Sequence, residues 1–69
     1  MKRGNFKTKT GLKLDFVVFN SSIRVYDDGE EIAFLRIDLV EVNGYADNVS
    51  VFPMYRRQGI ATFMYNKLE

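Results

Sequence analysis

The chain has 69 residues, 46% of them hydrophobic, and a formal net charge of +1 at pH 7. This length allows one small domain with a thin margin of stability. The low net charge gives only weak overall attraction to nucleic acid or anionic membranes. Without cysteine or histidine, the chain has no disulfide, no thiolate metal site and not the commonest catalytic base. We therefore expect no metal site.

No apolar run approaches the ~20 residues that span a bilayer. No apolar segment follows the basic N-terminus, as it would in a signal peptide. We therefore expect a cytoplasmic protein that does not contact a membrane.

Residues 1–10 are polar and basic, which predicts either a mobile tail or a short edge strand. From Leu12 to Phe19 hydrophobic residues alternate with others, so one face of a first clear strand is apolar throughout. Asn20-Ser21-Ser22 is typical of a turn. A second strand then begins at Ile23.

Asp28-Gly29 separates this second strand from a third and predicts a hairpin with a type I′ turn, in which both central residues have positive φ. The third strand is long, covering residues 31–42. Its hydrophobic phase changes near Leu39, which predicts a bulge or a strong twist. Asn43-Gly44 predicts a second hairpin turn.

Residues 45–52 form a predicted fourth strand, which ends at Pro53 because proline has no N–H for the ladder. Beyond a glycine turn, helical spacing of hydrophobic residues predicts a C-terminal helix. Its apolar positions are Ile60, Phe63, Met64 and Leu68. The fold class is therefore α+β, a single domain over residues 1–69, with a four-stranded antiparallel meander followed by one helix.

Residues 51–61 bring a strand end, a proline, two arginines and a glycine directly before this helix. Gly59 lets the backbone approach a ligand closely, and the helix start offers unpaired N–H groups and the positive end of a dipole. Arg56 and Arg57 add formal charge. The predicted ligand is a phosphate or pyrophosphate.

The segment Arg56-Arg57-Gln58-Gly59-Ile60-Ala61 is similar to the (Arg/Gln)-x-x-Gly-x-(Gly/Ala) signature of the GNAT superfamily of N-acetyltransferases. The preceding Val51-Phe52-Pro53-Met54-Tyr55 resembles the lead-in from that family's fourth strand. The upstream hairpins fit its strands two to four. The resemblance implies the core of an acyltransferase that moves acetyl from acetyl-coenzyme A to an amine.

By this resemblance, backbone N–H groups of the turn would hold the pyrophosphate of acetyl-coenzyme A, and the thioester arm would run beside the fourth strand like an added strand. The implied cofactor-binding residues are Val49, Val51, Arg56, Arg57, Gln58, Gly59, Ile60 and Ala61.

The chain departs from the family because it ends at Glu69, directly after the signature helix. The family's fifth strand, the helix that carries its tyrosine acid and the helices of its acceptor site have no counterpart. We expect a partial domain, either cut from a longer protein or encoded in shortened form. The unpaired edge of the fourth strand predicts a partner, either a second copy or a host protein.

Acetyl transfer requires a base that takes the proton from the amine. Without histidine, the candidate bases are Asp38, Glu41 and Asp47. Tyr55 and Tyr65 are candidate acids, although each is more typical of a packing residue with a solvated hydroxyl.

The alternative function is a catalytically inert GNAT-like protein that binds a host protein. A third hypothesis is a small β-protein that stacks single-stranded nucleic acid on its aromatic residues. These aromatic residues are Phe16, Phe19, Tyr26 and Phe34, and the basic N-terminal residues are Lys2, Arg3, Lys7, Lys9 and Lys13. Aromatic residues in strands are more typical of a core, and the basic residues of a solvated tail, so nucleic acid is not the expected partner.

Overall fold

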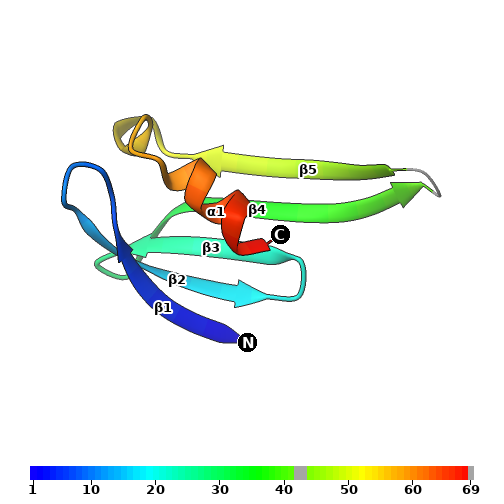
Figure 1. Ribbon diagram of the computed structural model, residues 1–69, viewed down its shortest axis with the longest axis horizontal. Coiled ribbons are helices and arrows are strands. Elements are labelled where there is room, and N and C mark those ends of the chain that lie inside the picture. The colour runs from blue at the N-terminus through cyan, green and yellow to red at the C-terminus, as the bar shows by residue number, and fades with distance from the viewer. Residues whose placement is uncertain (42–43, 69) are drawn as a thin grey trace.

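The computed structural model describes residues 1–41 and 44–68, with the backbone alone for 38–41 and 44–47. Five strands form one antiparallel sheet in chain order, and a 3-10 helix and an α-helix follow (Figure 1). The elements are β1 (Lys2–Lys7), β2 (Lys13–Phe19), β3 (Ser22–Asp27), β4 (Glu30–Glu41), β5 (Gly44–Val51), η1 (Pro53–Tyr55) and α1 (Ile60–Leu68). The α+β prediction is confirmed, with one strand more than the four expected.

The turns between strands follow the predicted chemistry where they are described. Asp28 and Gly29 both have positive φ, 52° and 84°, as a type I′ turn requires. In the preceding turn, the hydroxyl of Ser22 donates to the carbonyl of Phe19 at 2.8 Å. The turn predicted at Asn43-Gly44 lies partly outside the described residues, and Gly44 begins β5.

Two bulges distort β4. The register between β4 and β5 shifts between Leu39 and Glu41, which confirms the bulge predicted from the change of hydrophobic phase. A second bulge was not predicted. Val25 pairs with Ala33 while Tyr26 pairs with Glu31, so Ile32 is an extra residue in β4. Its side chain is only 1% exposed, because the bulge turns it into the core.

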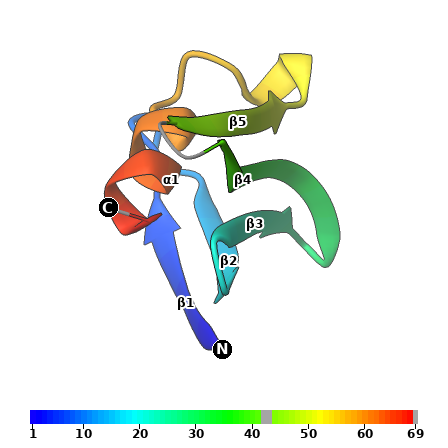
Figure 2. The ribbon, with the colours of Figure 1, turned by 90° about the vertical axis from the view of Figure 1, so that its right-hand side faces the viewer.

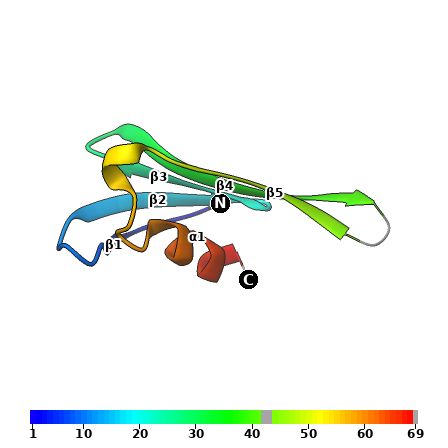
Figure 3. The same ribbon diagram turned by 90° about the horizontal axis from the view of Figure 1, so that it is seen from above.

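The core lies between α1 and one face of the curved sheet, as Figures 2 and 3 show from two directions. Strand side chains at alternating positions meet Ile60 and Met64 of the helix. The buried hydrophobic residues are Leu14, Phe16, Ile23, Val25, Ile32, Ala33, Leu35, Ile60 and Met64. The apolar phases predicted for the strands containing Leu14 and Leu35 are therefore confirmed.

The N-terminal residues form the edge strand β1, the second of the two structures considered for them. Gly4 lies opposite Phe16, and a Cβ at position 4 would come within 2.8 Å of the Phe16 ring. Phe6 stacks on Phe63 of α1 with ring centroids 3.6 Å apart. Strand β1 thus packs against the helix as well as against β2.

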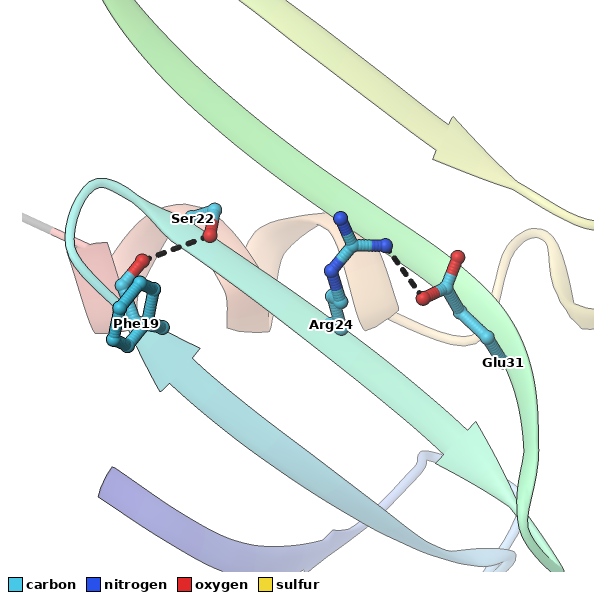
Figure 4. A network of polar contacts seen from close by, with 4 residues as sticks. All are labelled: Phe19, Ser22, Arg24 and Glu31. Carbon is cyan, nitrogen blue, oxygen red and sulfur yellow. Dashed lines mark hydrogen bonds and ion pairs between the residues drawn. The ribbon is translucent and has the colours of Figure 1, made fainter. Parts of the chain in front are cut away.

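Helix α1 leaves the other face of the sheet uncovered, and no other α-helix lies on it among the described residues (Figure 3). Figure 4 shows the polar contacts on this face, where Arg24 and Glu31 form an ion pair at 2.7 Å. The hydrogen bond to Glu31 and its negative charge raise the pKa of Arg24. Both side chains are solvent-exposed, so the pair contributes little to stability. Phe16, one of the aromatic residues considered for base stacking, is instead buried on the helix side at 5% exposure.

Strands β4 and β5 extend together beyond α1 and the remaining strands (Figure 1). Val49 on β5 is 45% exposed. Within the described residues, no helix is long and apolar enough to cross a bilayer.

Candidate functional site

The polypeptide leaves the sheet through a single 3-10 turn. The N–H of Phe52 donates to the carbonyl of Ile32 at 2.9 Å, the last link to β4. Phe52 has the extended geometry expected before proline, with ψ of 140°. The N–H of Tyr55 then donates to the Phe52 carbonyl at 2.8 Å and closes η1. This turn redirects the chain from β5 toward the start of α1.

The connection from η1 to α1 contains two residues in the left-handed region. Arg57 has φ of 63° and Gly59 has φ of 81°. Glycine adopts this conformation without penalty, whereas a left-handed arginine is uncommon and strained. Such strain is typical of functional turns, where the surrounding structure fixes an unfavourable backbone.

Helix α1 begins with free donors directed at this turn. The N–H of Phe63 donates to the carbonyl of Gly59 at 2.9 Å. The N–H groups of Ile60, Ala61 and Thr62 precede this bond and have no partner within the helix. The first turn of α1 contains no acidic residue, so nothing there offsets the positive end of the helix dipole.

The strand end, the turn and the helix start enclose a hollow of about 420 Å³. Its lining carries cationic side chains and backbone donors but no carboxylate among the described residues. The lining residues are Lys9, Val51, Tyr55, Arg56, Arg57, Gly59, Ile60, Ala61 and Thr62. Arg56 also donates from its Nε to the carbonyl of Val51 at 3.2 Å, which holds the guanidinium beside β5.

Most residues that the signature implies for cofactor binding meet in this hollow. They are Val51, Arg56, Arg57, Gly59, Ile60 and Ala61. Val49 lies two residues back along β5, outside the lining. Gln58 does not line the hollow, and its side-chain carbonyl accepts a hydrogen bond from Thr10 at 2.8 Å.

The loop between β1 and β2 forms one side of the site, which the sequence did not indicate. The N–H of Thr8 donates to the Leu12 carbonyl at 2.9 Å, and the N–H of Gly11 donates to the Thr8 carbonyl at 3.0 Å. These bonds close a compact turn that lies beside the start of α1 (Figure 1). Through this turn Lys9 reaches the hollow. The only sequence signal was a short run of threonine, lysine and glycine between two strands.

Tyr55 lines the hollow but directs its hydroxyl elsewhere. The hydroxyl donates to Oδ2 of Asp27 at 2.5 Å. This hydrogen bond raises the pKa of Tyr55 above its ordinary value of 10.0, and partial burial and the charges of Asp27 and Glu30 act in the same direction. Tyr55 therefore keeps its proton at neutral pH and ties η1 to the β3–β4 turn.

The structure describes the other catalytic candidates less completely than Tyr55. Asp38 pairs with Ala46 across β4 and β5, and Asp47 pairs with Ile37. Glu41 is the last residue of β4. The side chains of these three acidic residues lie outside the described part of the chain. Tyr65 is partly buried on α1 and packs against the core.

An antiparallel sheet with a cationic hollow at the start of its helix defines an α+β protein with a candidate anion-binding site. Residues 8–69 match the model of the Acetyltransferase (GNAT) family. The chain therefore belongs to this acetyltransferase family. The match includes the β1–β2 loop and the whole strand–turn–helix unit. Searches among curated proteins and among solved structures gave no match.

Proposed function

We propose that the hollow binds acetyl-coenzyme A through its pyrophosphate, and that the chain is the core of an N-acyltransferase that acetylates an amine. The observation that supports this most directly is the hollow itself. It combines backbone N–H groups at the start of α1 with the side chains of Arg56 and Arg57. Backbone donors, a helix dipole and guanidinium groups are the standard elements of phosphate recognition. Membership of the acetyltransferase family supports the same ligand.

The pantetheine arm would run from Val51 toward Val49. These residues are two positions apart on β5, so their side chains share one face of the sheet. Among the described residues, β5 is the last strand of the sheet and has β4 as its one neighbour. Its outer edge therefore offers backbone groups to an extended ligand. The thioester carbonyl would then lie near the β4–β5 arm, where Asp38 and Asp47 are the proposed bases.

The reaction would proceed by attack of the amine nitrogen on the thioester carbonyl, followed by departure of the coenzyme thiolate. A carboxylate of the arm would take the amine proton. Tyr55 would protonate the thiolate only after its hydroxyl leaves Asp27 and moves from the pyrophosphate end of the site toward the arm. The proposed bases are therefore Asp38, Glu41 and Asp47, and Tyr55 is the proposed acid.

A titration of the protein with coenzyme A, followed by the backbone amide resonances in NMR, tests the proposed ligand. We expect shifts concentrated on Arg57 to Ala61, because their N–H groups border the hollow. Resonances of the β2–β3 turn at Asn20 and Ser21, which do not line the hollow, serve as an internal control and should not move. The absence of any shift at millimolar coenzyme A would contradict the proposal.

The catalytically inert binding protein is a second candidate function. The observation in its favour is that the hydroxyl of Tyr55, the candidate acid, is held by Asp27. A measurement of the free thiol released from acetyl-coenzyme A in the presence of amine acceptors distinguishes the acyltransferase from the inert binding protein. Binding of coenzyme A without acceptor-dependent thiol release would favour the inert protein.

We further propose that a second copy of the chain faces the outer edge of β5 across the pantetheine arm, and so supplies the second wall of the coenzyme site. Three exposed apolar side chains lie in β5 or just after it. Val49 is 45% exposed, Phe52 44% and Met54 78%. The segment Asn48–Val51 is uncharged, so the edge of a second copy can approach there without like-charge repulsion. An open strand edge with these properties favours strand addition.

Light scattering during size exclusion should then show a dimer. Val49→Lys should convert it to a monomer, because a lysine on an exposed edge strand opposes pairing. Phe19→Lys is the matched control, since Phe19 is 54% exposed and lies away from β5. A wild-type monomer at high micromolar concentration would contradict self-pairing and leave a host protein as the partner to seek.

A further inference from the structure

The β1–β2 loop contacts the signature turn at two points. The N–H of Lys9 donates to the carbonyl of Gln58 at 3.5 Å, and the hydroxyl of Thr10 donates to its side-chain oxygen at 2.8 Å. The two threonine hydroxyls, of Thr8 and Thr10, lie 3.0 Å apart. Gln58 thus links two segments that are 48 residues apart in the chain. These contacts fix where Lys9 lies relative to the hollow.

The Lys9 side chain passes directly over Gly59. A Cβ at position 59 would lie 3.4 Å from Cε of Lys9 and 3.9 Å from its Cγ and Cδ. The aliphatic stem therefore contacts the bare glycine backbone and carries the ammonium group to the hollow, which Lys9 lines together with Arg56 and Arg57. Within the described residues, Lys9 has no carboxylate partner.

We propose that Lys9 is a third cationic ligand of the pyrophosphate, contributed from outside the signature. This inference rests on the proposed function. The two phosphate groups of a coenzyme A pyrophosphate each carry a negative charge. Arg56 is partly engaged by the Val51 carbonyl, and a lysine ammonium is a point charge that can donate hydrogen bonds to phosphate oxygens from several directions. Lys9 would therefore supply charge to the pyrophosphate that Arg56 supplies only in part.

The test measures the affinity of the full chain for coenzyme A and for dephospho-coenzyme A, which keeps the pyrophosphate but lacks the 3′-phosphate. The key variant is Lys9→Met, because methionine preserves apolar contact with Gly59 and removes only the charge. We expect it to weaken binding of both ligands by about five- to tenfold, as for the loss of one partly exposed charge-assisted contact. The loss should shrink as salt is raised.

Lys13→Met is the matched control, since Lys13 is an exposed lysine at the start of β2 that lies outside the lining of the hollow. It should change both affinities by less than about twofold, as expected for a distant and screened charge. Equal affinities of the two variants would overturn the proposal.

A loss seen with coenzyme A but not with dephospho-coenzyme A would also overturn the proposal, because Lys9 would then contact the 3′-phosphate. If the wild-type protein binds neither ligand, the proposed function itself fails, and the role of Lys9 fails with it. Equal melting temperatures of Lys9→Met and the wild type would show that any change in affinity comes from the lost charge and not from unfolding.

Discussion

Replacing Arg56 by glutamate is expected to remove detectable binding of coenzyme A while the fold remains intact. The substitution reverses a charge in the lining of the hollow, at the residue that follows η1. Loss of a charge-assisted contact plus new repulsion of phosphate should cost about 2–3 kcal/mol, or roughly 30- to 150-fold in affinity. The fold should survive because Arg56 is exposed and loses only its bond to the Val51 carbonyl.

Calorimetric titration of the variant with coenzyme A gives the measurement. Arg3→Glu makes the same change in net charge on β1, in a residue that does not line the hollow. It controls for long-range electrostatics. Arg56→Gln should retain part of the affinity, because the family signature admits glutamine at this position. Equal affinities of Arg56→Glu and Arg3→Glu would exclude Arg56 from the site.

Met64→Ala is expected to cause the largest loss of stability. Met64 is fully buried and, with Ile60, forms the part of α1 that enters the core. Truncation of a buried methionine to alanine costs about 2–5 kcal/mol through lost burial and a residual cavity. Domains have roughly 0.05–0.15 kcal/mol of stability per residue, so this loss is a large share of the total.

Thermal and urea unfolding followed by circular dichroism should show a melting temperature lowered by about 10 °C or more. Asn66→Ala, at an exposed position of the same helix, should leave the melting temperature within a few degrees. A small effect of Met64→Ala would mean that α1 is not docked on the sheet as described. Because α1 provides the N–H groups of the hollow, Met64→Ala should weaken binding as well.

The parts of the fold that follow from local chemistry were predictable. The type I′ turn at Asp28-Gly29 depends on two adjacent residues that tolerate positive φ. The bulge between Leu39 and Glu41 showed itself as a change of hydrophobic phase within one strand. No pattern in the sequence indicated the bulge at Ile32, because this bulge depends on how Val25 and Tyr26 pair with the neighbouring strand.

Strand β1 was undecided for a similar reason. Its sequence is mostly polar, and its structural role depends on two contacts with distant residues. These are the packing of Gly4 under Phe16 and the stacking of Phe6 on Phe63. Neither contact can be inferred from hydrophobic periodicity, since each joins residues that are far apart in the sequence.

The candidate site, like the fold, could be predicted from the sequence only in part. The signature predicted the strand, turn and helix, and most of its residues line one hollow. The part played by Lys9 escaped prediction because basic residues near an N-terminus are usually solvated. Its position depends on the bonds between the β1–β2 loop and Gln58, which only the folded chain reveals.

The position of α1 after all five strands has a consequence for how the chain folds during synthesis. The apolar face of the sheet stays uncovered until Ile60 and Met64 have left the ribosome. Until then, Leu35 and its buried neighbours are open to contact with other chains, a state that favours aggregation. The yield of native protein should therefore depend on how quickly α1 covers the sheet once it has been synthesised.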